Sequence, residues 1–126
     1  MLVGIGVDIE EVERVRVAIE RHGRRLLERV YTPGEIAYVE DKANRWERYA
    51  ARFAAKEAAS KALGTGWAQG VGWRDVEIVN EPGGRPTLVL HGRARERADA
   101  LGCARTWVSL SHTRGQAVAQ VALESA

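Results

Sequence analysis

A long alanine-rich segment in the middle of the chain constrains its fold more than any other sequence feature. Asn44, with Glu47 three residues later, is typical of a helix start, and Gly64 is typical of a helix end. We therefore predict one helix between Asn44 and Gly64. At about 100° per residue, one narrow stripe of this helix carries mostly aromatic side chains and a single carboxylate: Trp46, Tyr49, Phe53, Glu57, Ser60 and Gly64. The side with Arg48, Arg52 and Lys56 is expected to face solvent.

Shorter elements are predicted on both sides of this helix. Alternating apolar residues indicate a strand over residues 2–9. A charged helix is expected over residues 11–29 unless Gly23 interrupts it, and the capping-box residues Thr32 and Glu35 precede a short helix over 36–41. The remainder suggests a hairpin (75–79 with 87–90), a helix (93–101) and a second hairpin (106–111 with 117–123). The predicted helices cluster in the first half of the chain, and the predicted hairpins follow in the second half. This order predicts an α+β fold with a largely antiparallel sheet and a long central helix.

Length and composition limit the classes of partner. The 126 residues are expected to form a single domain over residues 1–126. Nineteen basic and seventeen acidic residues give a net charge of only +2, which does not indicate a nucleic-acid-binding protein. Cys103 is the only cysteine, and no apolar run is long enough for a membrane span, so we expect a cytoplasmic protein that binds no membrane.

Asp8 is the first candidate site residue. Gly4 and Gly6 leave one face of the predicted strand bare on the side where Asp8 projects, and glycine in a strand often marks the close approach of a ligand or another backbone. One interpretation is a binding site. The other is structural: a helix packs against the glycines, and Asp8 caps the helix that follows.

Glu57 is the second candidate, because it lies in the aromatic stripe of the long helix. A structural interpretation pairs it with Lys61 one turn later, which contributes only about 0.2–0.5 kcal/mol on an exposed helix. If Glu57 instead faces Asp8, the two carboxylates repel one another and need a proton or a cation between them. Oxygen ligands without thiolates or a histidine cluster favour Mg²⁺ over Zn²⁺. Lys61 would then lie near a phosphate, which indicates phosphoryl-group chemistry.

Two further segments carry weaker signals. His112 ends the run Ser109-Leu110-Ser111-His112 and is either a hydrogen-bonded turn residue or a catalyst. The turn Gly64-Thr65-Gly66 offers backbone amides to a phosphate, but it is not a Walker motif.

Taken together, these motifs resemble one family over nearly the whole chain. Gly4-Ile5-Gly6-Val7-Asp8-Ile9, the segment from Arg52 to Ala58, the segment from Ser60 to Gly66, and Ser109 to Thr113 occur in the order and spacing of the holo-acyl-carrier-protein synthases. These are the small homotrimeric group of the 4'-phosphopantetheinyl transferases. The resemblance implies the transferase fold of that family and Mg²⁺-dependent transfer of phosphopantetheine from coenzyme A to a serine of apo acyl carrier protein, in fatty acid biosynthesis.

The resemblance also implies a role for individual residues. Asp8 and Glu57 correspond to the Mg²⁺ ligands, Lys61 to the group that neutralises or protonates the leaving phosphate, and Glu57 or a water on the metal to the acceptor of the serine proton. The residues similar to those lining the coenzyme A site are Lys56, Ser60, Lys61, Gly66, Pro86, Ser111 and His112.

Quaternary structure and carrier binding follow from the same resemblance. Family members are homotrimers with active sites between subunits, and a second subunit would deepen the shallow cleft of so short a chain. Acyl carrier proteins are acidic, and a continuous helix would bring basic side chains into one arc: Arg14, Arg21, Arg24 and Arg25. The alternative for this arc is an ordinary solvated helix face.

Two other functions use the same residues. A Mg²⁺-dependent phosphohydrolase or nuclease would replace the carrier serine with water. A binding module for acidic proteins or RNA would use the arginines and leave Asp8 and Glu57 with structural roles only.

Overall fold

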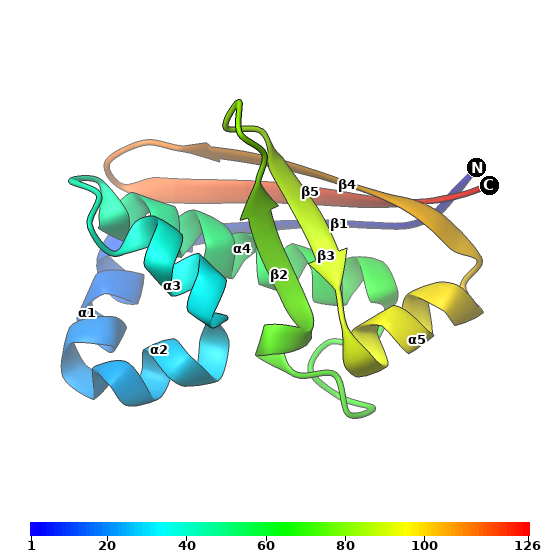
Figure 1. Ribbon diagram of the computed structural model, residues 1–126, viewed down its shortest axis with the longest axis horizontal. Helices are drawn as coiled ribbons and strands as arrows, with labels where there is room; N and C mark the ends of the chain where they lie inside the picture. Colours follow the sequence, from blue (N-terminus) through cyan, green and yellow to red (C-terminus); the bar gives the residue numbers. More distant parts are fainter.

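The computed structural model describes residues 1–126 as five helices, one 3-10 turn and five strands (Figure 1). In chain order they are β1 (Leu2–Glu11), α1 (Val12–His22), α2 (Arg24–Val30), α3 (Pro33–Val39), α4 (Arg45–Leu63), η1 (Trp73–Asp75), β2 (Val76–Asn80), β3 (Pro86–Leu90), α5 (Gly92–Ala100), β4 (Cys103–His112) and β5 (Gln116–Ser125). The predicted α+β class with a long central helix is confirmed.

Local sequence signals set most of the helix ends. The Thr32–Glu35 capping box forms at the start of α3, where the Thr32 side chain accepts a hydrogen bond from Glu35 N at 3.2 Å. Gly64 ends α4 in the left-handed conformation. Asn44 precedes α4 but does not cap it; its Oδ1 accepts a hydrogen bond from Arg48 Nε at 2.8 Å instead. Gly23, with φ of 59°, divides the charged helix into α1 and α2.

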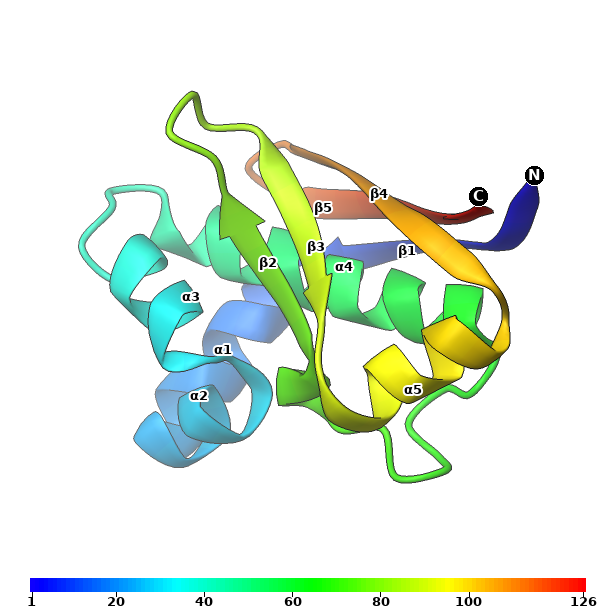
Figure 2. The same cartoon turned by 45° about the vertical axis from the view of Figure 1, so that its right-hand side comes forward.

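All strand pairs are antiparallel, but they form two sheets rather than one. The larger sheet has the order β1-β5-β4, and β2 and β3 form a separate hairpin. Helix α4 lies between them, with the hairpin crossing it on one side and the three-stranded sheet on the other (Figures 1 and 2). Both sheets are therefore built around the same helix.

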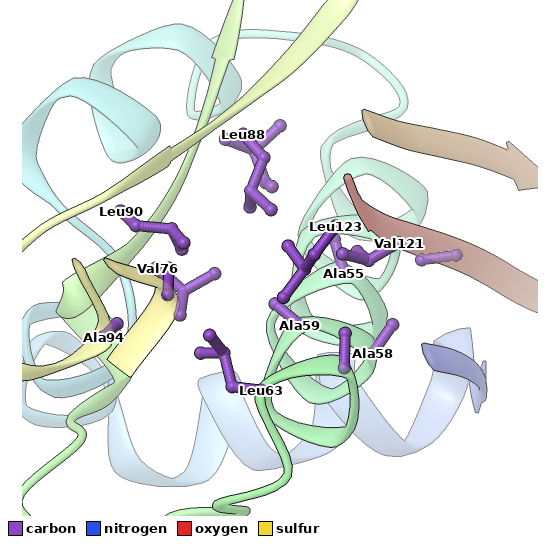
Figure 3. Close-up of a cluster of buried hydrophobic side chains, with 14 of the residues drawn as sticks. Ala55, Ala58, Ala59, Leu63, Val76, Leu88, Leu90, Ala94, Val121 and Leu123 are labelled. Atoms are coloured by element: carbon purple, nitrogen blue, oxygen red, sulfur yellow. The ribbon is translucent and has the colours of Figure 1, made fainter. Parts of the chain in front are cut away.

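Small side chains on α4 allow this close packing. Ala55, Ala58 and Ala59 are fully buried and face larger side chains from the hairpin and from β5, among them Val76, Leu88, Leu90, Val121 and Leu123 (Figure 3). A second apolar cluster joins α1, α2 and α3 to the first half of α4; its residues include Val12, Ile19, Val30, Tyr31, Val39, Tyr49 and Ala50. Helix α4 belongs to both clusters.

The side of α4 predicted to face solvent is mostly enclosed. Arg52 is 2% exposed and Lys56 is fully buried, whereas Arg48 is half-buried. Helix α3 and the hairpin cover this side of α4. Helix α3 carries Glu35, whose Oε1 accepts a hydrogen bond from Lys56 Nζ at 2.8 Å. The prediction was wrong because the compensating carboxylate lies 21 residues earlier in the chain.

The three-stranded sheet turns the more apolar face of β1 away from α4, although apolar side chains usually face the core. Its glycine face lies against α4, while Ile5, Val7 and Ile9 point outward and are 56–60% exposed. Trp107 of β4 is exposed as well. We call the outward surface formed by Ile5, Val7, Ile9 and Trp107 the outer sheet face. No helix is both long and apolar enough to cross a membrane.

Candidate active site

Two glycines bring β1 into backbone contact with α4. An ideal Cβ at Gly6 would overlap the carbonyl oxygen of Ala58, and one at Gly4 would overlap that of Ala62. Only glycine permits this approach. Because side chains two residues apart share a strand face, Asp8 also points toward α4. The close approach of a helix, one of the two interpretations of the glycines, is confirmed, and it is what places Asp8 beside the helix.

Lys61 of α4 binds Asp8 directly. Its Nζ donates hydrogen bonds to Asp8 Oδ1 at 3.1 Å and to the Val7 carbonyl at 3.0 Å. Lys61 forms no ion pair with Glu57, so the structural interpretation of an i, i+4 pair is wrong. Asp8 does not cap α1 either, since that helix begins without a side-chain cap. The other oxygen of Asp8, Oδ2, is buried and has no hydrogen-bond partner.

Glu57 lies one turn before Lys61 and has a different partner. Its Oε1 accepts a hydrogen bond from the indole nitrogen of Trp67 at 3.2 Å. Trp67 stacks on Trp73 with ring centroids 3.9 Å apart, and Trp73 stacks on Phe53 at 5.0 Å. Sequence reasoning missed Trp67, because it lies in a loop where no periodicity predicts the direction of a side chain.

Glu10 adds a third carboxylate that sequence reasoning also missed. Burial, the neighbouring Asp8 carboxylate and the charge of Glu57 raise the pKa of Glu10 to about 8. Burial is the largest cause of this shift, and the charges of Asp8 and Glu57 act in the same direction. The signal was available in the sequence: Glu10 follows Asp8 by two residues and therefore shares its strand face.

These carboxylates have the chemistry of a Mg²⁺ site that a ligand would complete. No group of three or more His, Cys, Asp or Glu side chains is arranged to hold a metal alone. Mg²⁺ normally uses one or two carboxylates together with water and phosphate oxygens, so Asp8 and Glu57 fit this ion. The unpartnered Asp8 Oδ2 is a free oxygen ligand in the right place.

The turn after α4 does not present free amides to a phosphate. The amides of Thr65 and Gly66 donate to the Ser60 carbonyl at 3.3 and 3.2 Å, and Gly64 N donates to the Lys61 carbonyl. The amides suggested as phosphate ligands therefore already donate hydrogen bonds that end the helix. Ser60 is buried, and its hydroxyl donates to the Glu57 carbonyl at 2.8 Å.

The other predicted coenzyme A residues lie apart from this cluster. Pro86 begins β3, and Ser111 is paired through Val118 with Ile9, which places it on the outer sheet face. His112 is exposed at the end of β4. None of the three hydrogen bonds to Asp8, Glu57 or Lys61. Lys56 is enclosed, and its Nζ donates to Glu35 and to the carbonyls of Trp73 and Val76.

The four arginines predicted to bind a carrier protein are all exposed, but they do not share one helix. Arg14 and Arg21 lie on α1, whereas Arg24 and Arg25 begin α2. A single arc was expected only if Gly23 did not interrupt the helix, and Gly23 separates α1 from α2. A cleft of about 370 Å³ opens beside α1, and its lining includes Glu10, Arg14, Leu26, Phe53 and Trp73.

Comparison with known protein families gives one consistent match. The family model described as the 4'-phosphopantetheinyl transferase superfamily matches residues 4–121. A holo-[acyl-carrier-protein] synthase of Solibacter usitatus is 55% identical over 125 residues, which is 99% of this chain and 100% of that protein. The synthase of the same name from Koribacter versatilis is 56% identical over 124 residues, which is 98% of this chain and 99% of that protein.

Solved structures agree with these sequence matches. The holo-[acyl-carrier-protein] synthase of Neisseria meningitidis superposes with a TM-score of 0.89 at 30% identity, covering 99% of this chain and 100% of that chain. The Helicobacter pylori synthase, solved in complex with coenzyme A, gives a TM-score of 0.83 at 32% identity, covering 95% and 99%. The glycine contact, the carboxylates and Lys61 thus lie within a fold that these synthases share.

Proposed function

Because the chain belongs to the 4'-phosphopantetheinyl transferase superfamily, we propose that it transfers 4'-phosphopantetheine from coenzyme A to a serine of an apo acyl carrier protein. The product would be the holo carrier protein, with release of adenosine 3',5'-bisphosphate. The observation that supports this proposal is the contact of β1 with α4, in which Asp8 accepts a hydrogen bond from Lys61, one helical turn after Glu57.

We propose Asp8 and Glu57 as ligands of a Mg²⁺ ion that also binds the diphosphate of coenzyme A. The support is the unpartnered Oδ2 of Asp8, together with the pKa of Glu10, which burial and the charges of Asp8 and Glu57 raise. When bound, Mg²⁺ supplies positive charge to the phosphate oxygens as the phosphoryl group is transferred.

Lys61 and Glu57 are the proposed catalytic residues. The serine oxygen forms a bond to the phosphorus attached to pantetheine, and the bond from that phosphorus to the bridging oxygen breaks. Glu57, directly or through a water, accepts the serine proton. Lys61 is half exposed, so its Nζ can turn from Asp8 to the bridging oxygen and neutralise or protonate the leaving group.

Further contacts to coenzyme A are proposed at Ser60, Gly66, Pro86, Ser111 and His112. We omit Lys56, because three acceptors already enclose its ammonium group. Since Pro86, Ser111 and His112 lie away from Asp8 in one chain, we propose that they serve the active site of a neighbouring subunit in a homotrimer. The apolar outer sheet face supports such an assembly, because an exposed patch of this kind is typical of an interaction site.

The proposed docking surface for the carrier protein consists of Arg14, Arg21, Arg24 and Arg25. Acyl carrier proteins are acidic, and Arg14 also lines the cleft that reaches Glu10. Replacing Arg14 and Arg21 with glutamate should weaken carrier binding at least about tenfold at low salt and less at high salt. Replacing Arg93 and Arg95 of α5 changes the net charge equally and is the matched control. A fall in coenzyme A affinity, with carrier binding intact, would contradict this assignment.

One assay tests the reaction itself. The protein is incubated with coenzyme A, Mg²⁺ and an apo acyl carrier protein, and the carrier is then weighed by mass spectrometry. We expect the carrier to gain one phosphopantetheine group, with no gain in EDTA. Cleavage of coenzyme A without a gain in carrier mass would indicate a phosphohydrolase instead. No reaction of either kind would leave only a binding function.

The cellular setting follows from the proposed substrate. Acyl carrier proteins hold acyl chains as they are built, so we place the reaction in fatty acid biosynthesis. The unpaired Cys103 is consistent with the cytoplasm, where thiols stay reduced.

A further inference from the structure

Trp67 is the only side chain that donates a hydrogen bond to the Glu57 carboxylate. Its indole nitrogen lies 3.2 Å from Oε1, and no group of the chain donates to Oε2. One oxygen of Glu57 is therefore held by the protein, and the other is left for a ligand.

The loop that carries Trp67 is tied to the end of α4. The amides of Thr65 and Gly66 both donate to the Ser60 carbonyl, which returns the chain over the last turns of the helix. Neighbouring residues Ala68, Gln69 and Gly70 are exposed, whereas Trp67 is half-buried. The loop thus directs this one large side chain back toward Glu57.

Aromatic stacking fixes the plane of the indole. Trp67 and Trp73 stack with centroids 3.9 Å apart and an angle of 27° between their planes, and Phe53 extends the stack from α4 itself. Trp73 belongs to η1, so the ring of Trp67 is held by a second element as well as by its own loop. Few orientations remain open to its N–H group.

We propose that Trp67 is a positioning residue that holds the Glu57 carboxylate in the orientation needed to bind a divalent cation. The inference rests on the proposed role of Glu57 as a metal ligand. Hydrogen bonds to metal-binding groups typically change metal affinity or activity by about 10–100-fold. Such a bond acts by reducing the number of carboxylate orientations that the cation must select.

Three variants test this proposal, with Mn²⁺ as the probe in the presence of coenzyme A and its dissociation constant measured by electron paramagnetic resonance. Trp67→Phe keeps the stacked ring and removes the N–H donor, and it should bind Mn²⁺ about tenfold more weakly than wild type. Trp73→Phe is the matched control, because it changes the same stack without touching the hydrogen bond, and it should bind within twofold of wild type. Equal weakening of both variants would assign the effect to the stack and overturn the proposal.

Glu57→Gln separates this proposal from the metal site itself. If Glu57→Gln loses Mn²⁺ affinity and Trp67→Phe does not, the positioning role is wrong and the ligand role stands. If wild type binds no Mn²⁺, or if Glu57→Gln binds it as wild type does, the metal site is wrong and the positioning role falls with it.

Indole resonances give a second measurement, made on the wild-type protein with variants used only to assign the signals. The four tryptophans give four indole N–H signals in a protein labelled with nitrogen-15, and Trp67→Phe and Trp107→Phe identify two of them. Trp107 donates to Glu124 Oε1 at 3.1 Å on the outer sheet face and is an internal control. Addition of Mg²⁺ should shift the Trp67 signal and leave that of Trp107 in place. A Trp67 signal that does not respond to Mg²⁺ while the wild-type protein binds it would overturn the proposal.

Discussion

Helix α4 carries two charged clusters that differ in almost every physical respect. The enclosed cluster consists of Glu35, Arg52 and Lys56, all of which are at most 2% exposed. The open cluster consists of Asp8, Glu10, Glu57 and Lys61, which lie at the edge where β1 meets the helix. Lys56 and Lys61 are five residues apart in the same motif, yet one is buried and the other is half exposed.

Several hydrogen bonds to Glu35 and Lys56 distinguish the enclosed cluster, in which only Arg52 Nε lacks a partner. Glu35 accepts from Lys56 Nζ, from the Thr32 amide and from the Ile78 amide at 2.8–3.0 Å. Burial lowers the pKa of Lys56, while the charge of Glu35 acts in the opposite direction. This cluster connects α3, α4 and the hairpin, so we assign it a role in the fold.

The open cluster is more exposed and less completely paired. Asp8 Oδ2 has no partner, Glu10 has a pKa raised to about 8, and Lys61 is bound on one side only. A group of charges that a protein leaves incompletely paired is a candidate for ligand binding. The comparison teaches that the charge of a residue says less about its role than the number of partners the fold gives it.

The largest expected effect is on turnover, at Glu57. Glu57→Gln should lower the rate of transfer about 10²–10⁴-fold, because it removes a charge at the reacting groups. The thermal midpoint should stay close to that of wild type, since the substitution leaves every core side chain in place. The rate is measured with the mass assay. A rate equal to that of wild type would show that Glu57 has no catalytic role.

The next largest effect is on stability, at Lys56. Lys56→Met leaves buried Glu35 with only the more distant cation of Arg52, whose Nε lies 3.9 Å from Oε2. It should lower the free energy of unfolding by about 3 kcal/mol, as measured by urea denaturation. The double variant Lys56→Met/Glu35→Gln should recover part of this loss. Lys61→Met should change stability by less than about 1 kcal/mol, because its pair is half exposed. Equal losses of stability in the two lysine variants would show that the enclosed and open clusters do not differ in their contribution to folding.

The last expected effect is a pH dependence of stability that Glu10 introduces. In the folded chain its pKa is about 8, against an ordinary value near 4.5. Between these values the unfolded chain has lost the proton and the folded chain keeps it, so stability falls as pH rises and levels off above about 8. In EDTA, Glu10→Gln should therefore become more stable relative to wild type from pH 5 to pH 8. A difference that is constant with pH would show that Glu10 is not perturbed.

The elements and the principal candidates could be predicted because their signals are local. Capping at Thr32, the glycine after α4 and the period-2 pattern of β1 lie within a few residues of the structure they specify. The same periodicity put Asp8 on the glycine face and Glu57 and Lys61 on one side of the helix. Their approach to one another needed only the contact of one strand with one helix.

The features that the sequence did not predict depend on contacts between distant segments or on the conformation of a loop. Burial of Lys56 depends on Glu35, which belongs to another helix, and the capture of Glu57 by Trp67 depends on a loop conformation. The division of the arginines depends on whether Gly23 adopts a positive φ, and the helical pattern continues through it on either side. None of these three outcomes has a fixed spacing that a single sequence could reveal.

The contact of Gly4 and Gly6 with α4 also has a consequence for how this protein can change over evolutionary time. Main-chain atoms on both elements set the spacing between the strand that bears Asp8 and the helix that bears Glu57. Substitutions elsewhere on β1 or α4 can then accumulate while the two carboxylates keep their separation. Gly4 and Gly6 themselves can hardly change, and because they are fixed, other positions of β1 and α4 are free to diverge in sequence.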